Sequence, residues 1–316
     1  MRLIALRTGR LIGLLWLVSV LVFLALRLSP GDPAAMLLGP KSGRVDIEPA
    51  LAELRSQMGL DRSLPVQYGI WTKRVVMGDF GASNRSGVPV REMVFEALPV
   101  TLWLIGLALV VALPISIFLG IVGAANERRA IGRVVRLIAT ISLATPAFWI
   151  GIILIEIFAV KLDWLPAGGY VSLLDSPVEF AEHMVLPVAA LATFMIGVLT
   201  RYVYAEAIEV RRQPYIRTAH AEGLPGRVIE LRFVARNALI PLIAVAGAQV
   251  GALIGGAVLS EQLFGLPGVG QLVLNGVLGR DYQVVQGTVL ITTVFVLLIT
   301  EVAEVAYRLV DPRLRT

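Results

Sequence analysis

Long stretches without a charged residue are the feature that most constrains the fold of this chain. A membrane-spanning helix needs about 20 largely apolar residues, because the hydrocarbon core is roughly 30 Å thick and each residue rises about 1.5 Å. Six such stretches occur, and the shorter ones can extend by a turn because a flanking Lys or Arg can reach the membrane surface. They are residues 11–26, 97–126, 137–155, 184–200, 237–260 and 282–300. The sequence therefore predicts an all-α polytopic membrane protein with six transmembrane helices.

The composition argues against the common soluble alternatives. Hydrophobic residues make up 57% of the 316 residues and charged residues 16%, against about 45–50% and 25% in a typical soluble protein. Too little polar surface remains for a soluble enzyme, a disordered chain or a nucleic-acid-binding protein of this size. The chain has no Cys and only two His, His183 and His220, so we expect neither a disulfide nor a metal site.

A seventh charge-free stretch, residues 262–279, is rich in Gly and also contains Pro267 and Asn275. These residues favour a loop or a re-entrant turn over a further span. The distribution of Arg supports this interpretation, because with six spans the short loops rich in Arg and both termini fall on the inner side. We therefore expect cytoplasmic N- and C-termini and a first span that is not cleaved as a signal peptide.

The predicted spans divide the chain into three parts. Residues 1–30 are expected to hold the cytoplasmic N-terminus and the first transmembrane helix, and residues 31–96 an extracytoplasmic segment. Residues 97–316 are expected to form a five-helix core with a long inner loop at 206–237.

Two helices are expected in the extracytoplasmic segment. Pro49 and Pro65 are each suited to the first turn of a helix, and Gly59 and Gly78 follow the expected ends of these helices at Met58 and Met77.

Motifs of common hydrolytic enzymes are absent from the sequence. There is no G-x-x-x-x-G-K-[ST] phosphate loop, no H-E-x-x-H and no G-x-S-x-G. An intramembrane hydrolase would need a nucleophile and a base that face each other, and both His fall outside the predicted spans. We therefore expect the chain not to be an enzyme.

The inner loop before the fifth predicted span has the marks of a short helix. Pro214 suits its first turn and Gly223 suits the left-handed position that ends it. Tyr215, Ala219 and Gly223 recur every four residues, so they share one face. A helix of about two turns is unstable alone in water, and its small Ala219 face would allow close approach to a groove in a partner. The alternative is an interfacial loop whose Arg residues bind lipid headgroups.

The same loop resembles a known family. Tyr-Ile-Arg-Thr-Ala-His-Ala-Glu-Gly-Leu at 215–224, followed by Arg-Asn-Ala-Leu-Ile-Pro at 236–241, is similar to the coupling loop of inner-membrane permease subunits of ATP-binding-cassette importers. The resemblance is greatest to the dipeptide, oligopeptide and nickel branch. Further similar stretches are Pro-Gly-Asp-Pro-Ala at 30–34, Met-Gly-Asp-Phe-Gly-Ala-Ser at 77–83, Leu-Ser-Glu-Gln-Leu-Phe-Gly-Leu-Pro-Gly-Val-Gly at 259–270 and Arg-Asp-Tyr-Gln-Val-Val-Gln-Gly at 280–287.

The resemblance implies the role of the loop and the partners of the chain. The loop would insert into a cleft of a separate ATPase subunit through Tyr215, Ile216, Arg217, Thr218, Ala219, His220, Ala221, Glu222, Gly223 and Leu224. Two cytoplasmic ATPases would bind ATP and Mg, while this chain would bind no cofactor. The other implied partners are a second, related permease subunit, an extracytoplasmic substrate-binding protein and the lipid of the cytoplasmic (inner) membrane.

This chain departs from the wider importer family at the start of the loop. Arg217-Thr218-Ala219 stands where that family has Glu-Ala-Ala, so Glu222 and Arg217 are both candidates for the role of the missing Glu. By the resemblance, the substrate would be a short peptide, with a nickel complex or another small solute as the alternative.

Small and amide residues in the last two spans are candidates for packing or for the transport pathway. Gly247, Gly251 and Gly255 share one face of the fifth predicted span, and such a stripe predicts a close helix contact, within the subunit or with the second permease. Gln249, Gln283 and Gln286 line the pathway or bond a neighbouring helix, and both interpretations stay open.

The position of carboxylates along the predicted spans distinguishes an importer subunit from an ion-coupled secondary transporter. A proton- or sodium-coupled carrier is expected to hold a carboxylate near the middle of the membrane. The candidate is Glu156, and its place one turn from Lys161 indicates a side chain that reaches the membrane surface. A functional carboxylate at Glu156 is the alternative.

Overall fold

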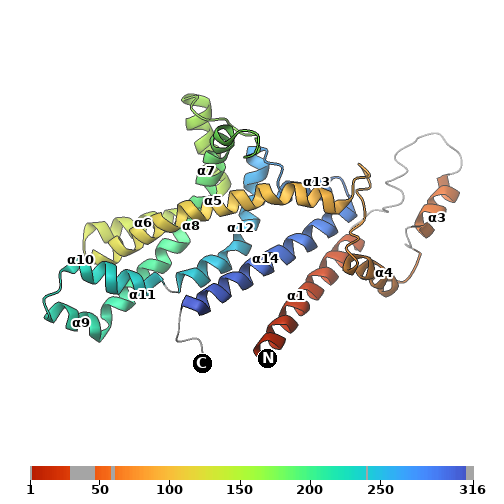
Figure 1. Cartoon of the computed structure of the whole chain (residues 1–316). Helices are drawn as coiled ribbons and strands as arrows, with labels where there is room; N and C mark the ends of the chain where they lie inside the picture. Colours follow the sequence, from red (N-terminus) through yellow and green to blue (C-terminus); the bar gives the residue numbers. More distant parts are fainter. Residues whose placement is uncertain (1, 29–46, 58–60, 240, 311–316) are drawn as a thin grey trace. The chain divides into compact units, whose positions relative to one another are not determined.

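The computed structural model describes residues 2–28, 47–57, 61–239 and 241–310. Within these residues the structure is helical, with no strand beyond an isolated bridge between Ala82 and Pro89. The helices (Figure 1) are α1 (Arg2–Arg27), α3 (Ile47–Gln57), α4 (Leu64–Val76), α5 (Val90–Ala125), α6 (Ala130–Ala144), α7 (Ala147–Leu154), the π-helix η1 (Ile155–Lys161), α8 (Pro177–Arg212), α9 (Pro214–Ala221), α10 (Gly226–Val228), the π-helix η2 (Ile229–Ala235), α11 (Arg236–Leu239), α12 (Leu242–Phe264), α13 (Val269–Leu278) and α14 (Tyr282–Val310).

Length and composition mark three to five of these helices or helix pairs as candidate membrane spans. Val90–Ala125, Pro177–Arg212 and Tyr282–Val305 qualify alone. Two bent pairs, α6 with α7 and η1, and α12 with α13, qualify if each pair is one span. The all-helical membrane architecture predicted from the sequence is confirmed, and a count of six spans stays a prediction.

The third predicted span, residues 137–155, is divided by a break. The axes of α6 and the following α7–η1 segment differ by 98°. Thr145 between them is extended, with φ −92° and ψ 124°, because the ring of Pro146 disfavours helical geometry in the residue before it. The sequence predicts a single span here, and the structure shows two helical segments with a sharp bend between them.

The Gly-rich stretch 262–279 is more helical than the sequence predicts. α12 continues to Phe264 and α13 occupies Val269–Leu278, with a change of direction of 76° between them. The residues between the two helices, 265–268, are called the α12–α13 turn below. The expected turn is present, but it occupies four residues and not the whole stretch.

Contacts divide the chain into two units, and the first comprises residues 1–98 and 271–297. In this unit α4 has the bounds that its sequence predicts, with Ser63 before it, Pro65 in its first turn and Met77 at its end. The Tyr68 ring of α4 packs against Phe23 of α1 with centroids 5.4 Å apart. The first expected helix appears as α3, while residues 30–34, Met58 and Gly59 lie outside the described residues.

A hairpin at residues 81–89 is fastened to the start of α14 within the same unit. The Ser83 hydroxyl donates a 2.6 Å hydrogen bond to Oδ2 of Asp281, which is 2% exposed. The Ala82 N–H donates to Oε1 of Gln283 over 2.7 Å. Gln283 therefore bonds a backbone group of its own chain.

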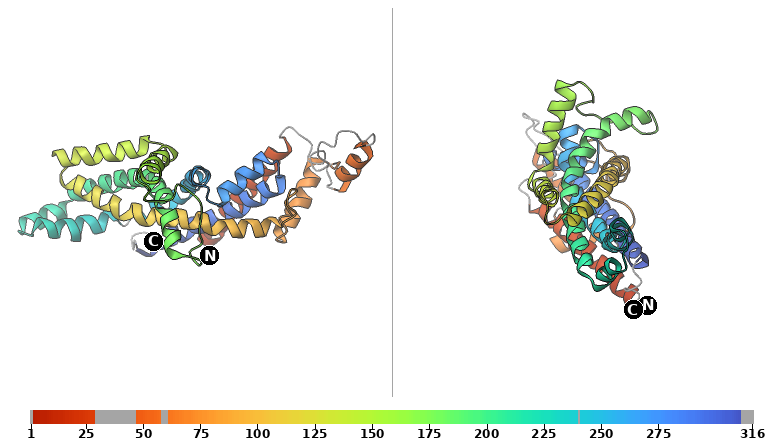
Figure 2. Two further views of the ribbon diagram at one scale, coloured as in Figure 1. Left: turned by 90° about the horizontal axis from the view of Figure 1, so that it is seen from above. Right: turned by 90° about the vertical axis from the view of Figure 1, so that its left-hand side faces the viewer.

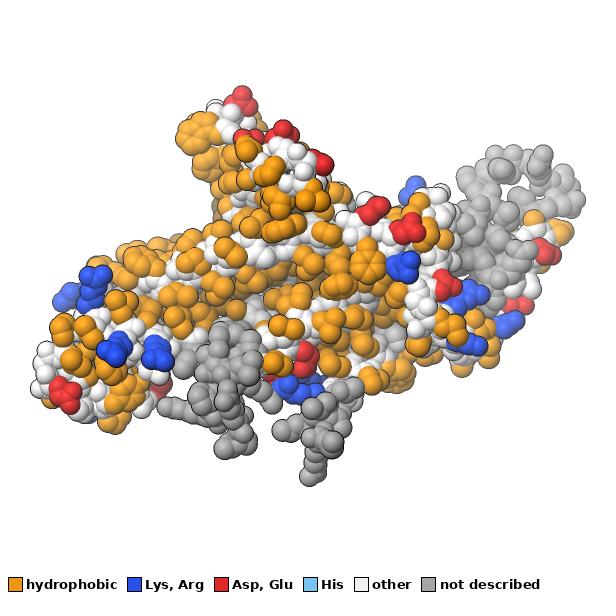
Figure 3. All heavy atoms as spheres, viewed as in Figure 1, with side chains coloured by type: hydrophobic (Ala, Val, Ile, Leu, Met, Phe, Trp, Pro, Cys, Tyr) orange, Lys and Arg blue, Asp and Glu red, His pale blue; other side chains and the backbone are white. Residues whose placement is uncertain are grey.

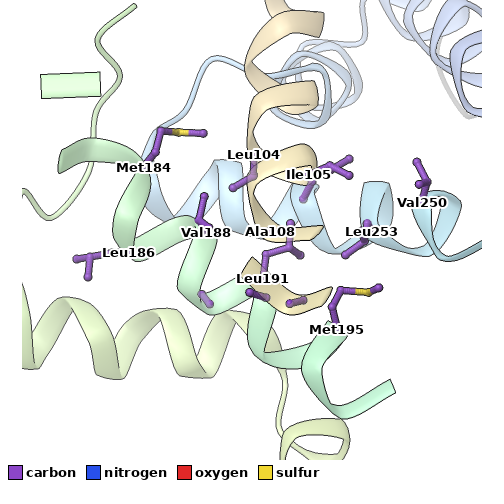
Figure 4. Close-up of a cluster of buried hydrophobic side chains, with 14 of the residues drawn as sticks. Leu104, Ile105, Ala108, Met184, Leu186, Val188, Leu191, Met195, Val250 and Leu253 are labelled. Atoms are coloured by element: carbon purple, nitrogen blue, oxygen red, sulfur yellow. The ribbon is translucent and has the colours of Figure 1, made fainter. Parts of the chain in front are cut away.

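The second unit comprises residues 99–270 and 298–316, and α8 is its central helix. α8 contacts α6, α7 and α12, and Figure 1 shows α6 and α8 side by side. Figure 4 shows side chains of α5, α8 and α12 that meet in its apolar core. The labelled side chains are Leu104, Ile105, Ala108, Met184, Leu186, Val188, Leu191, Met195, Val250 and Leu253.

Large apolar side chains also cover the outside of these helices (Figure 3). Val110 and Phe118 of α5 are each 66% exposed, and Leu137 of α6 is 58% exposed. Contiguous exposed apolar surface of this kind fits contact with lipid or with another membrane protein. The pattern agrees with the membrane location that the composition indicates.

Candidate functional site

The predicted short helix of the inner loop is α9, which begins at Pro214 and ends at Ala221. Gln213 before it is extended, with ψ 144°, and Pro214 occupies its first turn. Gly223 follows with φ +76°, a left-handed conformation that a side chain would strain. The limits read from Pro214 and Gly223 are therefore confirmed. α9 and α10 lie together at the end of α8 (Figures 1 and 2).

One side of α9 is buried in its own chain. Ile216 is 3% exposed and Ala219 is 4% exposed. They join a small apolar cluster, called the loop cluster below, which unites residues of α5, α8, α9, η2 and α11. Its buried members are Ala124, Ala207, Ile216, Ala219, Ile229, Val234 and Ala238. A helix too short to be stable alone is held by this packing.

The other side of α9 is open. Tyr215 is 43% exposed, and Leu224 is half-buried. The remaining exposed residues are Arg217, Thr218, His220, Ala221, Glu222 and Gly223. The sequence favours a partner contact through the small Ala219 face, and the structure corrects this, because Ala219 packs inward. A partner would meet the exposed residues, which include Tyr215, Arg217 and Glu222.

An ion pair closes the loop that carries α9. Arg211 in the last turn of α8 pairs through Nη2 with Oε1 of Glu230 at the start of η2. Both side chains are partly buried, with 29% and 24% exposed. Nη1 of Arg211 donates a 3.2 Å hydrogen bond to the carbonyl oxygen of Ala124 in the last turn of α5. Basic side chains gather on the surface near this end of the unit (Figure 3).

The candidate pathway residues of α12 differ in their surroundings. Gly247 is buried, and a Cβ on it would lie 2.1 Å from Cβ of Ala303, so Gly247 permits a close helix contact within the chain. Gly251 and Gly255 are exposed, and a Cβ on Gly255 would meet nothing within 4 Å. Gln249 is half-buried. The stripe predicted as one seam is therefore divided between a packed end and an open end.

In α14, Gln283 and Gln286 are not equivalent either. Gln283 is half-buried and bonds Ala82, as described above, whereas Gln286 is buried, with 7% of its surface exposed.

Glu156 lies beside Lys161, as predicted. Its Oε1 is 3.2 Å from Nζ of Lys161, and the two side chains are 54% and 66% exposed. The pair with Lys161 agrees with a side chain near the membrane surface, and that location stays a prediction.

A buried carboxylate that the sequence analysis did not single out lies at the α12–α13 turn. Glu261 is 0% exposed, and its Oε1 accepts a 2.5 Å hydrogen bond from Oγ1 of Thr101 in α5. The same Thr101 oxygen accepts a 2.9 Å hydrogen bond from the N–H of Val269, the first residue of α13. Thr101 thus connects the carboxylate to the start of α13.

Two glycines make room for this carboxylate. A Cβ on Gly268 would lie 2.2 Å from the Glu261 carboxyl carbon, and one on Gly270 would lie 2.6 Å from Cα of Val258. In the sequence Glu261 separates two charge-free stretches, so its position indicates the boundary of a span and not a buried site. The signal that could have found it is the close spacing of Glu261, Gly268 and Gly270 in the sequence.

Comparison with known proteins identifies the family. The family described as the binding-protein-dependent transport system inner membrane component matches residues 112–316. Its N-terminal counterpart, a membrane component of the same systems, matches residues 1–105. The chain belongs to this family, the inner-membrane permease subunits of ATP-binding-cassette importers in the peptide and nickel branch.

Individual relatives align over nearly the whole chain. A putative peptide transport system permease protein of Brucella abortus is 36% identical over 309 residues, which cover 98% of this chain and 97% of the relative. An oligopeptide transport system permease protein of Bacillus subtilis is 36% identical over 312 residues, with the same coverage of both chains. A glutathione transport system permease protein of Escherichia coli strain K12 is 36% identical over 309 residues, 97% of each chain.

Proposed function

We propose that this chain is the permease subunit of an ATP-driven importer and forms half of a pathway for short peptides across the cytoplasmic membrane. Family membership supports the transport role, and the names of the relatives, which include peptide, oligopeptide and glutathione permeases, support a peptide substrate. The other half of the pathway is a second, related permease, and an extracytoplasmic binding protein delivers the substrate.

The observation that carries the proposal is the two-sided character of α9. Its apolar side is already buried in the loop cluster, so its polar side is free to bind another protein. The exposed residues of α9 and its end include the Tyr215 ring and the charged side chains of Arg217 and Glu222, groups suited to a mixed polar and aromatic contact. The partner is a cytoplasmic ATPase that binds ATP and Mg and drives α9 when it changes conformation. Glu222 and Arg217 are the charged groups available to contact it.

The orientation follows from the basic residues. Arg-rich ends and loops tend to face the cytoplasm, which supports an inner location of α9 and of both termini. The absence of Cys from the sequence makes this simple to test. A single Cys at exposed Thr218 should react with a membrane-impermeant maleimide only from the cytoplasmic side, and one at exposed Ser86 only from outside. The reverse pattern would overturn the orientation.

The exposed end of the small-residue stripe suits contact with the second permease. Ala248, Gly251, Ala252 and Gly255 of α12 are all exposed and recur at helical spacing. Small side chains let a neighbouring helix approach closely in a membrane.

The function is tested by reconstitution in proteoliposomes with the second permease, the ATPases, the binding protein and a labelled tripeptide. Uptake should require ATP and every component. Uptake by this chain alone under a proton or sodium gradient would instead identify an ion-coupled carrier. Uptake of nickel but not of the peptide, with ATP, would keep the importer and change its substrate.

A further inference from the structure

The Arg211–Glu230 pair lies at the base of the loop that carries α9. Arg211 is in the last turn of α8, and Glu230 is in the first turn of η2. The pair therefore joins the chain as it enters the loop to the chain as it leaves. Because both side chains are about three-quarters buried, the contact is screened by water less than an exposed pair would be.

Arg211 also joins the base of the loop to α5. Its Nη1 donates to the carbonyl of Ala124, 3.2 Å away, and the last carbonyls of a helix have no partner within the helix. A cation there also interacts favourably with the helix dipole. Ala124 is 2% exposed and belongs to the loop cluster. One guanidinium thus connects α8, η2 and α5 beside the apolar packing that holds α9.

The pair uses only part of its bonding capacity. Nε of Arg211 and Oε2 of Glu230 are buried, and within the described part of the chain neither makes a hydrogen bond. A guanidinium and a carboxylate can form two parallel hydrogen bonds. In the structure the pair makes one of these bonds, from Nη2 of Arg211 to Oε1 of Glu230.

We propose that Arg211 and Glu230 are positioning residues that make a displacement of α9 move the end of α5. This inference rests on the proposed function, in which an ATPase displaces α9. The loop cluster alone is non-directional apolar packing, which resists separation more than sliding. The ion pair and the hydrogen bond to Ala124 depend on the orientation of the groups they join, so they resist sliding. With them, α9, the start of η2 and the end of α5 move as one body. Without them α9 still binds the ATPase but moves independently of α5.

The test uses the complete importer in proteoliposomes and six variants of this chain. Glu230→Gln and Arg211→Gln remove the charges of the pair. Arg212→Gln and Glu209→Gln are matched controls, because both side chains are exposed neighbours on the same helix. Peptide uptake, ATP hydrolysis and the amount of ATPase that co-purifies are measured for each. The ratio of ATP hydrolysed to peptide imported reports coupling.

With Glu230→Gln and Arg211→Gln we expect ATPase to co-purify at the wild-type level while the ratio of ATP to peptide rises about tenfold. The controls should stay within about twofold of the wild type. Exchanging the charges, Arg211→Glu with Glu230→Arg, should lower the ratio relative to Arg211→Glu alone. A wild-type ratio in both Gln variants would overturn the proposal. So would loss of ATPase from both, because the pair would then only build the docking surface.

A second measurement keeps this proposal separate from the proposed function. Spin labels at exposed Thr218 of α9 and exposed Phe118 of α5 report their separation in the full chain in nanodiscs, without transport. The distance distribution should broaden in Glu230→Gln and stay unchanged in Glu209→Gln. An unchanged distribution in Glu230→Gln overturns the proposed coupling. Absence of ATP-dependent uptake in the wild type, with the expected broadening, contradicts only the proposed function.

Discussion

Two short segments of the second unit, α9 and the α12–α13 turn, are held in place by different kinds of contact. At α9, apolar residues supply the packing, and a partly exposed pair, Arg211 with Glu230, closes the edge. At the α12–α13 turn, a fully buried carboxylate, Glu261, is bonded through Thr101 to the start of α13. From this difference in contacts we expect α9 to be the segment that can be displaced and the α12–α13 turn to be the segment that is fixed.

The physical reason lies in the cost of burying polar groups. A buried carboxylate is tolerated only when its hydrogen bonds are made, so a shift of Glu261 relative to Thr101 is costly because it breaks the hydrogen bond between them. Gly268 and Gly270 add steric limits, because backbone and carboxylate approach them closely. Packing of Ile216 and Ala219 has no such directional requirement. We therefore expect the turn to be rigid and α9 to be the adjustable part.

The largest effect is expected from Gly270→Ala. The new Cβ would lie 2.6 Å from Cα of Val258, a backbone atom that cannot rotate away, so overpacking should destabilise the chain by roughly 3 kcal/mol. Gly255→Ala is the control, because a Cβ there meets nothing within 4 Å and Ala favours a helix over Gly. Thermal unfolding in detergent measures both. Equal stability of the two variants would show that the turn is not tightly packed.

The next largest effect is expected from Thr101→Val, which keeps the shape of the side chain and removes its hydroxyl. Glu261 loses a donor and the Val269 N–H loses its acceptor. The expected loss is roughly 2 kcal/mol, because both groups are left buried without this partner. Thr101→Ser retains the hydroxyl and should recover most of the loss. If Thr101→Val is as stable as the wild type while Thr101→Ser is destabilised, the methyl packing and not the hydrogen bonds holds the turn.

The same two places show what the sequence can predict. The start and the end of α9 could be predicted from the sequence because Pro214 and Gly223 act through local backbone geometry. The bounds of α4 could be predicted for the same reason. The bond between Thr101 and Glu261 joins residues 160 positions apart, and no local pattern reports it. The inward direction of Ala219 likewise depends on the neighbours that the fold supplies.

Proline shows the same limit within single helices. Pro146 coincides with the break between α6 and α7, whereas Pro99 and Pro114 lie inside α5 and Pro187 lies inside α8. Neighbouring helices, Ser or Thr side chains and small local adjustments can satisfy the backbone groups that a proline frees in a membrane helix. Whether a proline ends a helix therefore depends on tertiary contacts, and the bend in the third predicted span could not be predicted from Pro146 alone.

A smaller and local effect is expected at α9. Ala219→Leu adds bulk inside the loop cluster, and we expect it to loosen α9 by about 1 kcal/mol. Because such an element can open without global unfolding, protease cleavage in the loop should accelerate several-fold while the melting temperature changes little. Thr218→Leu is the matched control on the exposed side. Equal cleavage of both variants would contradict the inward orientation of Ala219.

The smallest effect is expected at Glu156, the exposed counterpart of Glu261. Its pair with Lys161 is more than half exposed on both sides, and such pairs contribute about 0.5 kcal/mol or less. Glu156→Gln should therefore leave the melting temperature unchanged and ATP-dependent peptide uptake within about twofold of the wild type. Lys161→Gln should behave in the same way if the pair has no other role. Loss of uptake in Glu156→Gln alone, at wild-type stability, would mean that this carboxylate acts in transport, as intramembrane carboxylates of ion-coupled carriers do. The contrast between a fixed interior carboxylate and one at the surface of the chain would then fail, because exposure at the surface would not imply a dispensable group.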